Sequence, residues 1–544
     1  MMRRLAELSG IAGLAGLAWI AAGGGCSRER PRLSEPGAPD GAPQQTGYVP
    51  KAEYCVGSAP PGSPLCPIIP ANIGPDPMLD QTVAYNGIAP HPTSPATDVQ
   101  TPFDNLSWQT FVALNWTAGK ENQSAQQGLQ GTGRRVWENW PRVSELFGNA
   151  PVRAQCAVPP GLAVFQIGSN GKGKPVGQNE EYIQAATGAP LIDVSGNWTI
   201  YERRVNSVEV AYLKAPQGKT SWNLTTSAGQ QQLVKDHGMV SFPSFGLPGP
   251  PTGAIEIKAA WRVLDPAQRA HNQQSYYVVP AMLTVAPDLV SQAPGAPAAP
   301  ICAQVDLGLV AMHIIQKNPT TDNALKPEWF WSTFEHVDNA PLAADACDPT
   351  EPSQCKSLGQ LACPVAPNVG AYSYFNPACP DCATNQPPQA SQSGAAFAWS
   401  PTQPFASSYL TSAQHDGTTI TGLGTQVSRC WQIYTLTDQL NRQWRDQLRQ
   451  VGSVLQNYML IGTQWGASIT NTPDPRLPPN GVPTFLSNTL VETYLQTAPS
   501  GSCVACHRGA TLPVDDKTSS NLSFLPRLVT PGLLRRPPVH GDAH

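Results

Sequence analysis

The sequence predicts an α+β protein with a large β-rich body, arranged as an antiparallel, sandwich-like sheet, and a small helical module at the C-terminal end. Between residues 161 and 340, apolar and polar residues alternate with a period of two, which is typical of half-buried strands. After residue 430 the apolar residues recur every three or four positions, which is typical of helices facing a core. Charged residues make up only 13% of the 544 residues and there are 57 prolines, a composition that favours a loop-rich, exported protein.

The N-terminus has the pattern of an export signal. Arg3 and Arg4 precede the apolar run 11–22, which is too short to cross a bilayer, and a run of glycines leads to Cys26. Residues 1–26 resemble a bacterial lipoprotein signal peptide, in which the cysteine is lipidated and becomes the new N-terminus. The sequence departs from that pattern in having glycine three residues before the cysteine. Cleavage without lipid attachment, with release into the periplasm, is the alternative.

A linker and a β-rich domain are expected next. Residues 27–47 are rich in Pro and Gly and predict a flexible linker. Residues 48–340 are expected to form the β-rich domain, with one helix near its start for which Asp104 is a good N-cap. The period-two segments in this domain predict strands over 162–168, 197–205, 207–215, 253–264, 274–286, 304–317 and 329–338.

Cysteine usage indicates disulfide bonds. Setting aside Cys26 and a closely spaced pair near the C-terminus, ten cysteines remain, which suggests up to five disulfides in an exported protein. Six of the ten fall in residues 341–430, which are expected to be an irregular insertion held together by these bonds because they carry little apolar pattern. Cys379 and Cys382 form a CxxC pair that no histidine follows, so a local disulfide or two separate bridges is expected there.

Residues 431–530 predict a helical module. Apolar residues at helical spacing indicate one long amphipathic helix over 435–465, and a shorter helix is expected over 488–496. Residues 531–544 are expected to be a tail with little structure of its own.

The most informative motif is Cys503-Val504-Ala505-Cys506-His507, a CxxCH pentapeptide. In such a motif the two thiols add to the vinyl groups of a haem, and the next imidazole becomes the proximal iron ligand. The chain resembles the c-type cytochromes in this motif and, at most, over residues 455–530. The resemblance implies one covalent haem c, attached at Cys503 and Cys506 and ligated by His507, a modification made after export. A structural disulfide followed by an incidental histidine is the alternative.

The second iron ligand is left open by the sequence. In the commonest small cytochromes c, a methionine some dozens of residues after the motif supplies it, but only 37 residues follow His507 and none is Met. Candidates upstream are Met459, on the apolar side of the predicted long helix, and His313 and His336, on two strands that a hairpin would join. An iron without a second protein ligand, as in cytochromes of the c-prime type, is the fourth possibility, although those proteins are four-helix bundles.

The expected function is that of an exported monohaem c-type cytochrome, which transfers single electrons and therefore needs a redox partner protein. One alternative is a haem enzyme, peroxidase- or oxygenase-like, with an open distal site in the β-rich body; another is a haem-containing surface binding or sensor module. A net charge of −4 gives no argument for nucleic acid or anionic membrane as a partner, so membrane contact is expected only through a lipid on Cys26. The expected location is the bacterial periplasm or, for a lipoprotein, the outer membrane or cell surface.

Overall fold

The computed structural model describes most of the chain after residue 99. The described ranges are 100–147, 156–167, 189–214, 222–244, 253–290, 299–318, 328–349, 362–388, 411–415, 418–465, 483–498 and 501–529, with Ile69, Ile73, Tyr182 and Cys355. The predicted signal peptide, linker and tail lie outside these residues, as do Cys26, Cys55 and Cys66. No helix within the described ranges is long and apolar enough to cross a membrane.

The body is built on one seven-stranded sheet. Five strands lie side by side in the order β1 (Ala163–Ile167), β4 (Val278–Val285), β5 (Ile301–Asn318), β3 (Ile255–Val263) and β2 (Ile200–Val205). β6 (Glu328–His336) pairs with β5, and β11 (Tyr458–Gln464) pairs with β6. All pairs are antiparallel except β1 with β4, which are parallel.

The long strand β5 organises this sheet. One of its edges pairs with β3; the other pairs with β4 along its first half and with β6 along its second half. His313 lies opposite Thr333, so the predicted β5–β6 pair is confirmed, and His313 and His336 do share one sheet. The predicted sandwich of two stacked sheets is not seen in the described part of the chain. The other strands there form two-stranded sheets, β7 (Leu342–Cys347) with β10 (Arg429–Trp431) and β8 (Thr411–His415) with β9 (Thr418–Leu423).

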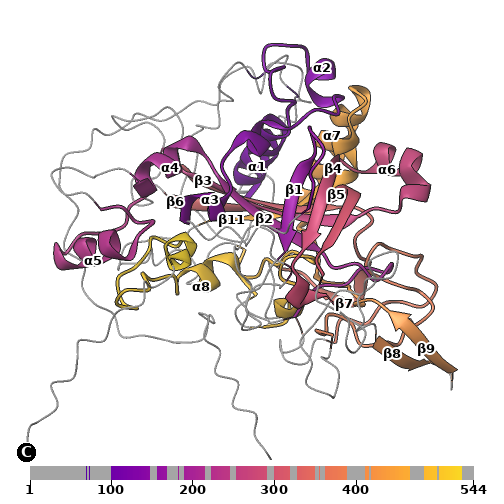
Figure 1. Cartoon of the computed structure of the whole chain (residues 1–544). Coiled ribbons are helices and arrows are strands. Elements are labelled where there is room, and N and C mark those ends of the chain that lie inside the picture. Colours follow the sequence, from indigo (N-terminus) through magenta and orange to yellow (C-terminus); the bar gives the residue numbers. More distant parts are fainter. Residues whose placement is uncertain are drawn as a thin grey trace, which may run out of the picture.

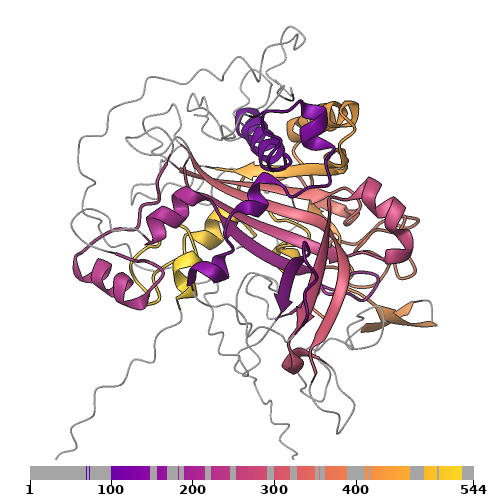
Figure 2. The same cartoon turned by 45° about the horizontal axis from the view of Figure 1, so that its top comes forward.

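The two faces of the large sheet are covered by different parts of the chain (Figures 1 and 2). Helices α1 (Gln100–Leu114) and α7 (Thr435–Gln450) pack on one face, where Met312 and Phe334 join Leu440 and Trp444 in a hydrophobic core. The C-terminal segment 501–529, which contains α8 (Cys503–His507), packs on the opposite face with α4 (Ser207–Lys214) and α5 (Ser227–Lys235). Alternating side chains of β5 and β6 therefore serve two separate cores.

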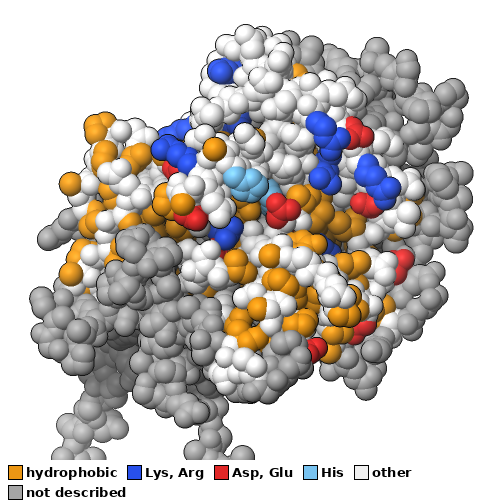
Figure 3. Space-filling model, turned by 90° about the vertical axis from the view of Figure 1, so that its right-hand side faces the viewer, with side chains coloured by type: hydrophobic (Ala, Val, Ile, Leu, Met, Phe, Trp, Pro, Cys, Tyr) orange, Lys and Arg blue, Asp and Glu red, His pale blue; other side chains and the backbone are white. Residues whose placement is uncertain are grey.

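The remaining helices are short. They are α2 (Ala125–Leu129), α3 (Val143–Phe147) and α6 (Arg269–Ser275), with 3₁₀ turns at Val136–Asn139, Pro266–Gln268, Pro287–Leu289, Val454–Asn457, Thr493–Leu495 and Leu525–Leu528. Figure 3 shows the side of the molecule at the right of Figure 1, where basic and acidic side chains lie interspersed among apolar ones.

The first predicted helix begins earlier than expected. α1 starts at Gln100, so Asp104 lies inside the helix and does not act as its N-cap. Its buried carboxylate instead accepts hydrogen bonds from the Thr437 hydroxyl of α7 and, at 3.1 Å, from the backbone N–H of Thr463 in β11. Asp104, which was predicted to cap one helix, thus connects α1 with α7 and β11.

Two predicted elements have the wrong type. The segment 207–215 was expected as a strand, but its described residues Ser207–Lys214 form helix α4. The Asn206 side chain accepts from the N–H of Glu209 at 3.0 Å and caps this helix. The predicted helix 435–465 ends at Gln450; Gly452, with φ of 70°, follows, and the chain then forms β11 at the sheet edge. The predicted helix 488–496 contains only the 3₁₀ turn Thr493–Leu495.

Four disulfides lie within the described residues. They join Cys156 to Cys302, Cys347 to Cys355, Cys363 to Cys430, and Cys379 to Cys382. The last confirms a local disulfide as one of the two expectations for the second CxxC pair. Four disulfides are compatible with an exported protein.

Candidate haem-attachment site

Helix α8 holds the CxxCH motif in a single turn. The hydroxyl of Ser502 caps it by accepting from the N–H of Ala505 at 3.2 Å. Gln464, at the end of β11, fixes the same end of the helix: its Oε1 accepts from the Val504 N–H at 2.8 Å, and its Nε2 donates to Ser502 Oγ at 2.9 Å. Val504 is fully buried against the sheet. The two cysteines, three residues apart, and the following histidine are therefore presented by one fixed helical turn.

The His507 ring is oriented for binding through one particular nitrogen. Its Nδ1 lies 2.6 Å from the carbonyl oxygen of Leu522, and because a carbonyl only accepts, Nδ1 carries the proton and donates. Nε2 makes no hydrogen bond within the described part of the chain. Rings of Trp331 and Phe524 pack against the imidazole, with centroids 5.4 and 4.9 Å away. Burial lowers the pKa of His507 to about 4, so the ring is neutral at pH 7.

The two cysteines of the motif differ in state. Cys503 is a free, half-buried thiol, and burial together with the nearby Glu492 carboxylate raises its pKa well above the usual range. Cys506 is disulfide-bonded, to a partner that is not among the described residues. Since one sulfur cannot form both a disulfide and a thioether, attachment of a haem vinyl group at Cys506 would require this disulfide to be reduced first.

Beneath α8, three neighbouring strands contribute one row of side chains. Lys258 of β3, His313 of β5 and Thr333 of β6 are paired in register across the sheet. Ile315 and Trp331, one step further along the same face, share a core with Val504 of α8. This face therefore places His313 beside the Trp331 ring that contacts His507.

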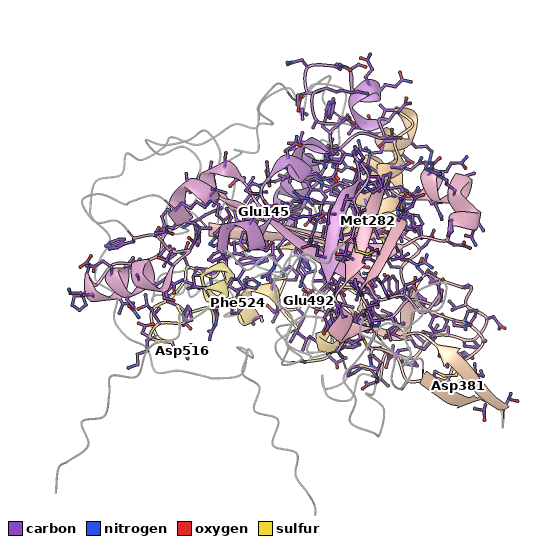
Figure 4. The ribbon with its side chains drawn as sticks, viewed as in Figure 1. Glu145, Met282, Asp381, Glu492, Asp516 and Phe524 are labelled. Carbon is purple, nitrogen blue, oxygen red and sulfur yellow. A yellow bond between two sulfur atoms is a disulfide. The ribbon has the colours of Figure 1, made fainter. Side chains whose placement is uncertain are left out.

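Two buried nitrogens on this face differ in their contacts. Nε1 of Trp331 has no hydrogen-bond partner among the described residues, whereas Nε2 of His313 faces a carboxylate; the two residues are 1% and 4% exposed. His313 Nε2 lies 3.2 Å from Oε1 of Glu492, close enough for an ion pair when the ring is protonated. Figure 4 shows Glu492 and Phe524 on the side of the sheet that carries α8. Burial alone would raise the pKa of Glu492, but His313 and Lys258 outweigh it and lower that pKa.

The other two candidate ligands lie elsewhere. His336 is on the opposite face, where it stacks on Tyr276 and both ring nitrogens are engaged: Nε2 donates to the Ser275 carbonyl at 2.9 Å, and Nδ1 accepts from the Asp338 N–H at 3.2 Å. Met459 is on the edge strand β11, not on a long helix as predicted.

Met459 is also far from the motif along the sheet. It pairs with Glu335, two same-face positions beyond Trp331, which is about 13 Å along the strand. The structure thus brings His313, and not His336 or Met459, towards the CxxCH helix.

Sequence reasoning missed the residues that surround the motif. Gln464, Trp331, Leu522 and Glu492 come from four separate segments, and none of them belongs to a local motif. The Ser502 cap was visible in the sequence, because serine directly before a short helix is a common N-cap.

The residues present fit a covalently attached haem. His507 has its proton held on Nδ1, which leaves Nε2 for a metal, and the buried Nε1 of Trp331, whose ring packs against His507, has no partner among the described residues. No group of three or more His, Cys, Asp or Glu side chains among the described residues is arranged to hold a bare metal ion. A haem iron does not require such a group, since the porphyrin supplies four of its ligands.

Comparison with known proteins adds no family to this description. No family model, no curated protein and no solved structure matches the chain.

Proposed function

We propose that this protein is an exported c-type cytochrome that transfers single electrons through one covalently bound haem, held in the C-terminal segment. The observation that carries the proposal is the His507 imidazole, which follows two cysteines on one helical turn and has its Nδ1 proton fixed by the Leu522 carbonyl. That hydrogen bond selects the tautomer in which Nε2 is the metal ligand and makes this nitrogen a stronger donor.

Each residue of the site has a defined task in this proposal. Cys503 and, once reduced, Cys506 would hold the haem by thioether bonds, and His507 would supply a nitrogen ligand to its iron. Trp331 and Phe524 pack against the imidazole and limit its movement. When bound, haem supplies an iron that cycles between the ferric and ferrous states, and burial and axial ligation set its potential. In this proposal the partner is a redox protein, and the predicted export signal ending at Cys26 supports a location in the periplasm or at the cell surface.

Haem attachment is tested by comparing two CxxC pairs in the same chain. The full chain is produced in the periplasm of a host with haem-attachment machinery, as wild type, as Cys503→Ala/Cys506→Ala and as Cys379→Ala/Cys382→Ala. Intact mass and the pyridine haemochrome spectrum are measured. We expect one haem in the wild type and in the Cys379/Cys382 variant, and none in the Cys503/Cys506 variant. A wild-type chain that carries no haem and keeps Cys506 in a disulfide would contradict the proposal.

Electron transfer is tested on the same holoprotein. Stopped-flow mixing with small soluble cytochromes of higher and lower potential should oxidise and reduce the haem rapidly. Rapid turnover with peroxide, combined with slow exchange with these cytochromes, would instead favour the haem enzyme.

A further inference from the structure

We propose that Asn521 is a positioning residue that sets the tautomer and the direction of the His507 ring before haem is attached, acting through the carbonyl of its neighbour Leu522. The inference rests on the proposed function, because a haem iron is the group that would bind the His507 nitrogen left without a proton. It adds a residue outside the CxxCH motif that tunes the reduction potential of the site.

The turn that carries the Leu522 carbonyl has an unusual backbone. The Ser523 N–H donates to the Ser520 carbonyl at 3.3 Å, so Asn521 and Leu522 are the two central residues of a β-turn. Both have positive φ, 57° and 67°. Asparagine tolerates this left-handed conformation, whereas leucine rarely adopts it. Such a conformation persists only where the surrounding contacts impose it.

The contacts that impose it converge on Asn521. Lys317 of β5 and Trp329 of β6 lie opposite each other in register. Asn521 Oδ1 accepts from Lys317 Nζ at 3.0 Å, and Trp329 Nε1 donates to the Asn521 carbonyl at 2.8 Å. The backbone N–H of Phe242 also donates to Oδ1, at 3.2 Å. All four residues are buried, so water is a poor replacement for any of these partners.

The other side of the turn is joined to the helix that carries His507. The Ser520 N–H donates to the Ala510 carbonyl at 3.1 Å, and the Ala510 N–H donates to the His507 carbonyl at 3.0 Å. The turn therefore connects the sheet with the end of α8. Between these two attachments, the Leu522 carbonyl lies 2.6 Å from His507 Nδ1.

This arrangement has a consequence for an iron bound by His507. Trp331, two residues from Trp329 on the same face of β6, packs against the ring, so one strand contacts the ring and, through Asn521, holds the acceptor of its proton. A proton held on Nδ1 leaves Nε2 for the metal, and the hydrogen bond makes the ring a stronger donor. A stronger donor favours the ferric state and lowers the reduction potential. Loosening the turn should therefore raise the potential.

The experiment uses three substitutions at Asn521 and one matched control. Asn521→Ala removes the side-chain acceptor and places alanine at positive φ, Asn521→Gly removes the acceptor but tolerates that φ, and Asn521→Asp keeps an oxygen acceptor for Lys317. The control is Asn385→Ala. Asn385 also has positive φ, 55°, and its side chain bonds the backbone of Ser428 on both sides, but it lies in the cysteine-rich segment 341–430.

The first measurement is the tautomer of His507 in the full chain produced without haem-attachment machinery. It is read from two-bond nitrogen–proton correlations of histidine-labelled protein at pH 7, with His507→Phe to assign the signal. We expect the wild type, Asn521→Asp and Asn385→Ala to show His507 protonated on Nδ1 only. Asn521→Ala and Asn521→Gly should show both tautomers, because the Leu522 carbonyl is no longer held in place.

The second measurement is the reduction potential of the holoprotein, which a purely structural role would not change. Asn521→Ala and Asn521→Gly should raise it by at least about 28 mV, which is a threefold change in the ferric-to-ferrous ratio at about 59 mV per factor of ten. Asn521→Asp should return it to the wild-type value or below. Urea unfolding of each variant measures the stability lost, and Asn385→Ala should lose stability without a change in potential.

The outcomes separate this inference from the proposed function. A chain that carries no haem overturns the proposed function, while the measurement on the haem-free chain still tests Asn521. A wild type with His507 protonated on Nε2, or a wild-type tautomer and potential in both Asn521→Ala and Asn521→Gly, overturns this inference alone. An equal change in Asn385→Ala also overturns it, because the effect would then follow from lost stability. If Asn521→Ala does not fold, Asn521→Gly decides the question.

Discussion

At the scale of single residues, the partners of the two ring nitrogens distinguish three histidines. His507, which is partly buried, has Nδ1 engaged and Nε2 without a hydrogen bond in the described chain, whereas Nε2 of the buried His313 lies 3.2 Å from a carboxylate oxygen of Glu492. His336 has both nitrogens engaged by backbone groups and is completely buried. His507 is therefore suited to ligation through Nε2, whereas His313 is held against Glu492 and His336 holds β6 against the Ser275 carbonyl.

His336 makes stability depend on pH. Burial lowers its pKa from 6.5 to about 4, despite opposing effects of the Ser275 carbonyl and Asp338; Arg262 and Arg445 lower it further. Below pH 6.5 the His336 side chain binds a proton in the unfolded chain but stays neutral in the folded chain. The unfolding free energy that this group contributes above pH 6.5 is therefore lost as the pH falls towards 4. The linked loss is about 3 kcal/mol.

The measurement is the urea unfolding free energy between pH 4 and 7 for wild type and His336→Phe. The variant keeps an aromatic ring between Tyr276 and Tyr458 but does not titrate, so its profile should be flatter by about 3 kcal/mol over this range. The exposed His271→Phe serves as control and should follow the wild type. Parallel profiles for wild type and His336→Phe would show that other groups cause the pH dependence.

At the scale of elements, α8 depends on the edge strand β11. Gln464 satisfies the N–H of Val504 and binds Ser502, and its Nε2 also donates to the Pro483 carbonyl at 2.6 Å. Gln464→Leu leaves a buried N–H of α8 without its acceptor, which should lower the unfolding free energy by about 1–3 kcal/mol. Gln432→Leu, which removes an exposed hydrogen bond to Ala346, is the matched control with an expected change below about 0.5 kcal/mol. Equal effects in urea denaturation would mean that Gln464 does not anchor the helix.

The type of an element could be predicted from the sequence where the spacing of its apolar residues matches the positions that are buried in the fold. Six of the seven expected strands contain an observed strand, because alternate side chains really do face two cores. The prediction of a strand over 207–215 was wrong because its β-branched residues favoured a strand, although the Asn206 side chain caps a helix there. The prediction of a helix over 458–464 was wrong because the helical period of α7 was extended across Gly452. In both cases a single capping residue decided the type of the element.

At the scale of the whole molecule, the candidate site is made by the sheet as much as by the motif. CxxCH could be found in the sequence because its chemistry is local. The contacts of Trp331 with His507 and of Glu492 with His313 join segments more than 150 residues apart, and no spacing within one segment encodes them. The pairing of β5 with β6 was predictable, and it is this pair that places His313 and Trp331 on the face beneath α8.

The disulfides of the segment 341–430 provide a test of how that segment is held. Cys363–Cys430 closes a loop with a sequence separation of 67, whereas Cys379–Cys382 closes one of 3. In the chain-entropy description, loss of the first should destabilise the fold by about 4 kcal/mol and loss of the second by about 2 kcal/mol, since the longer loop restricts the unfolded chain more.

The comparison uses Cys363→Ala/Cys430→Ala and Cys379→Ala/Cys382→Ala. All four cysteines lie in the described segment, and Cys363, Cys379 and Cys430 are buried, so both variants lose buried sulfur and the difference reports mainly on loop closure. Cys363 and Cys430 also pack with Trp431, whose ring stacks on Phe485 just before the stretch that leads to α8. We therefore expect the Cys363/Cys430 variant alone to lower the unfolding free energy strongly and to reduce the yield of haem attachment. If the haem yield fell equally in both variants, the stability of this segment would not control haem attachment, and the expectation would be wrong.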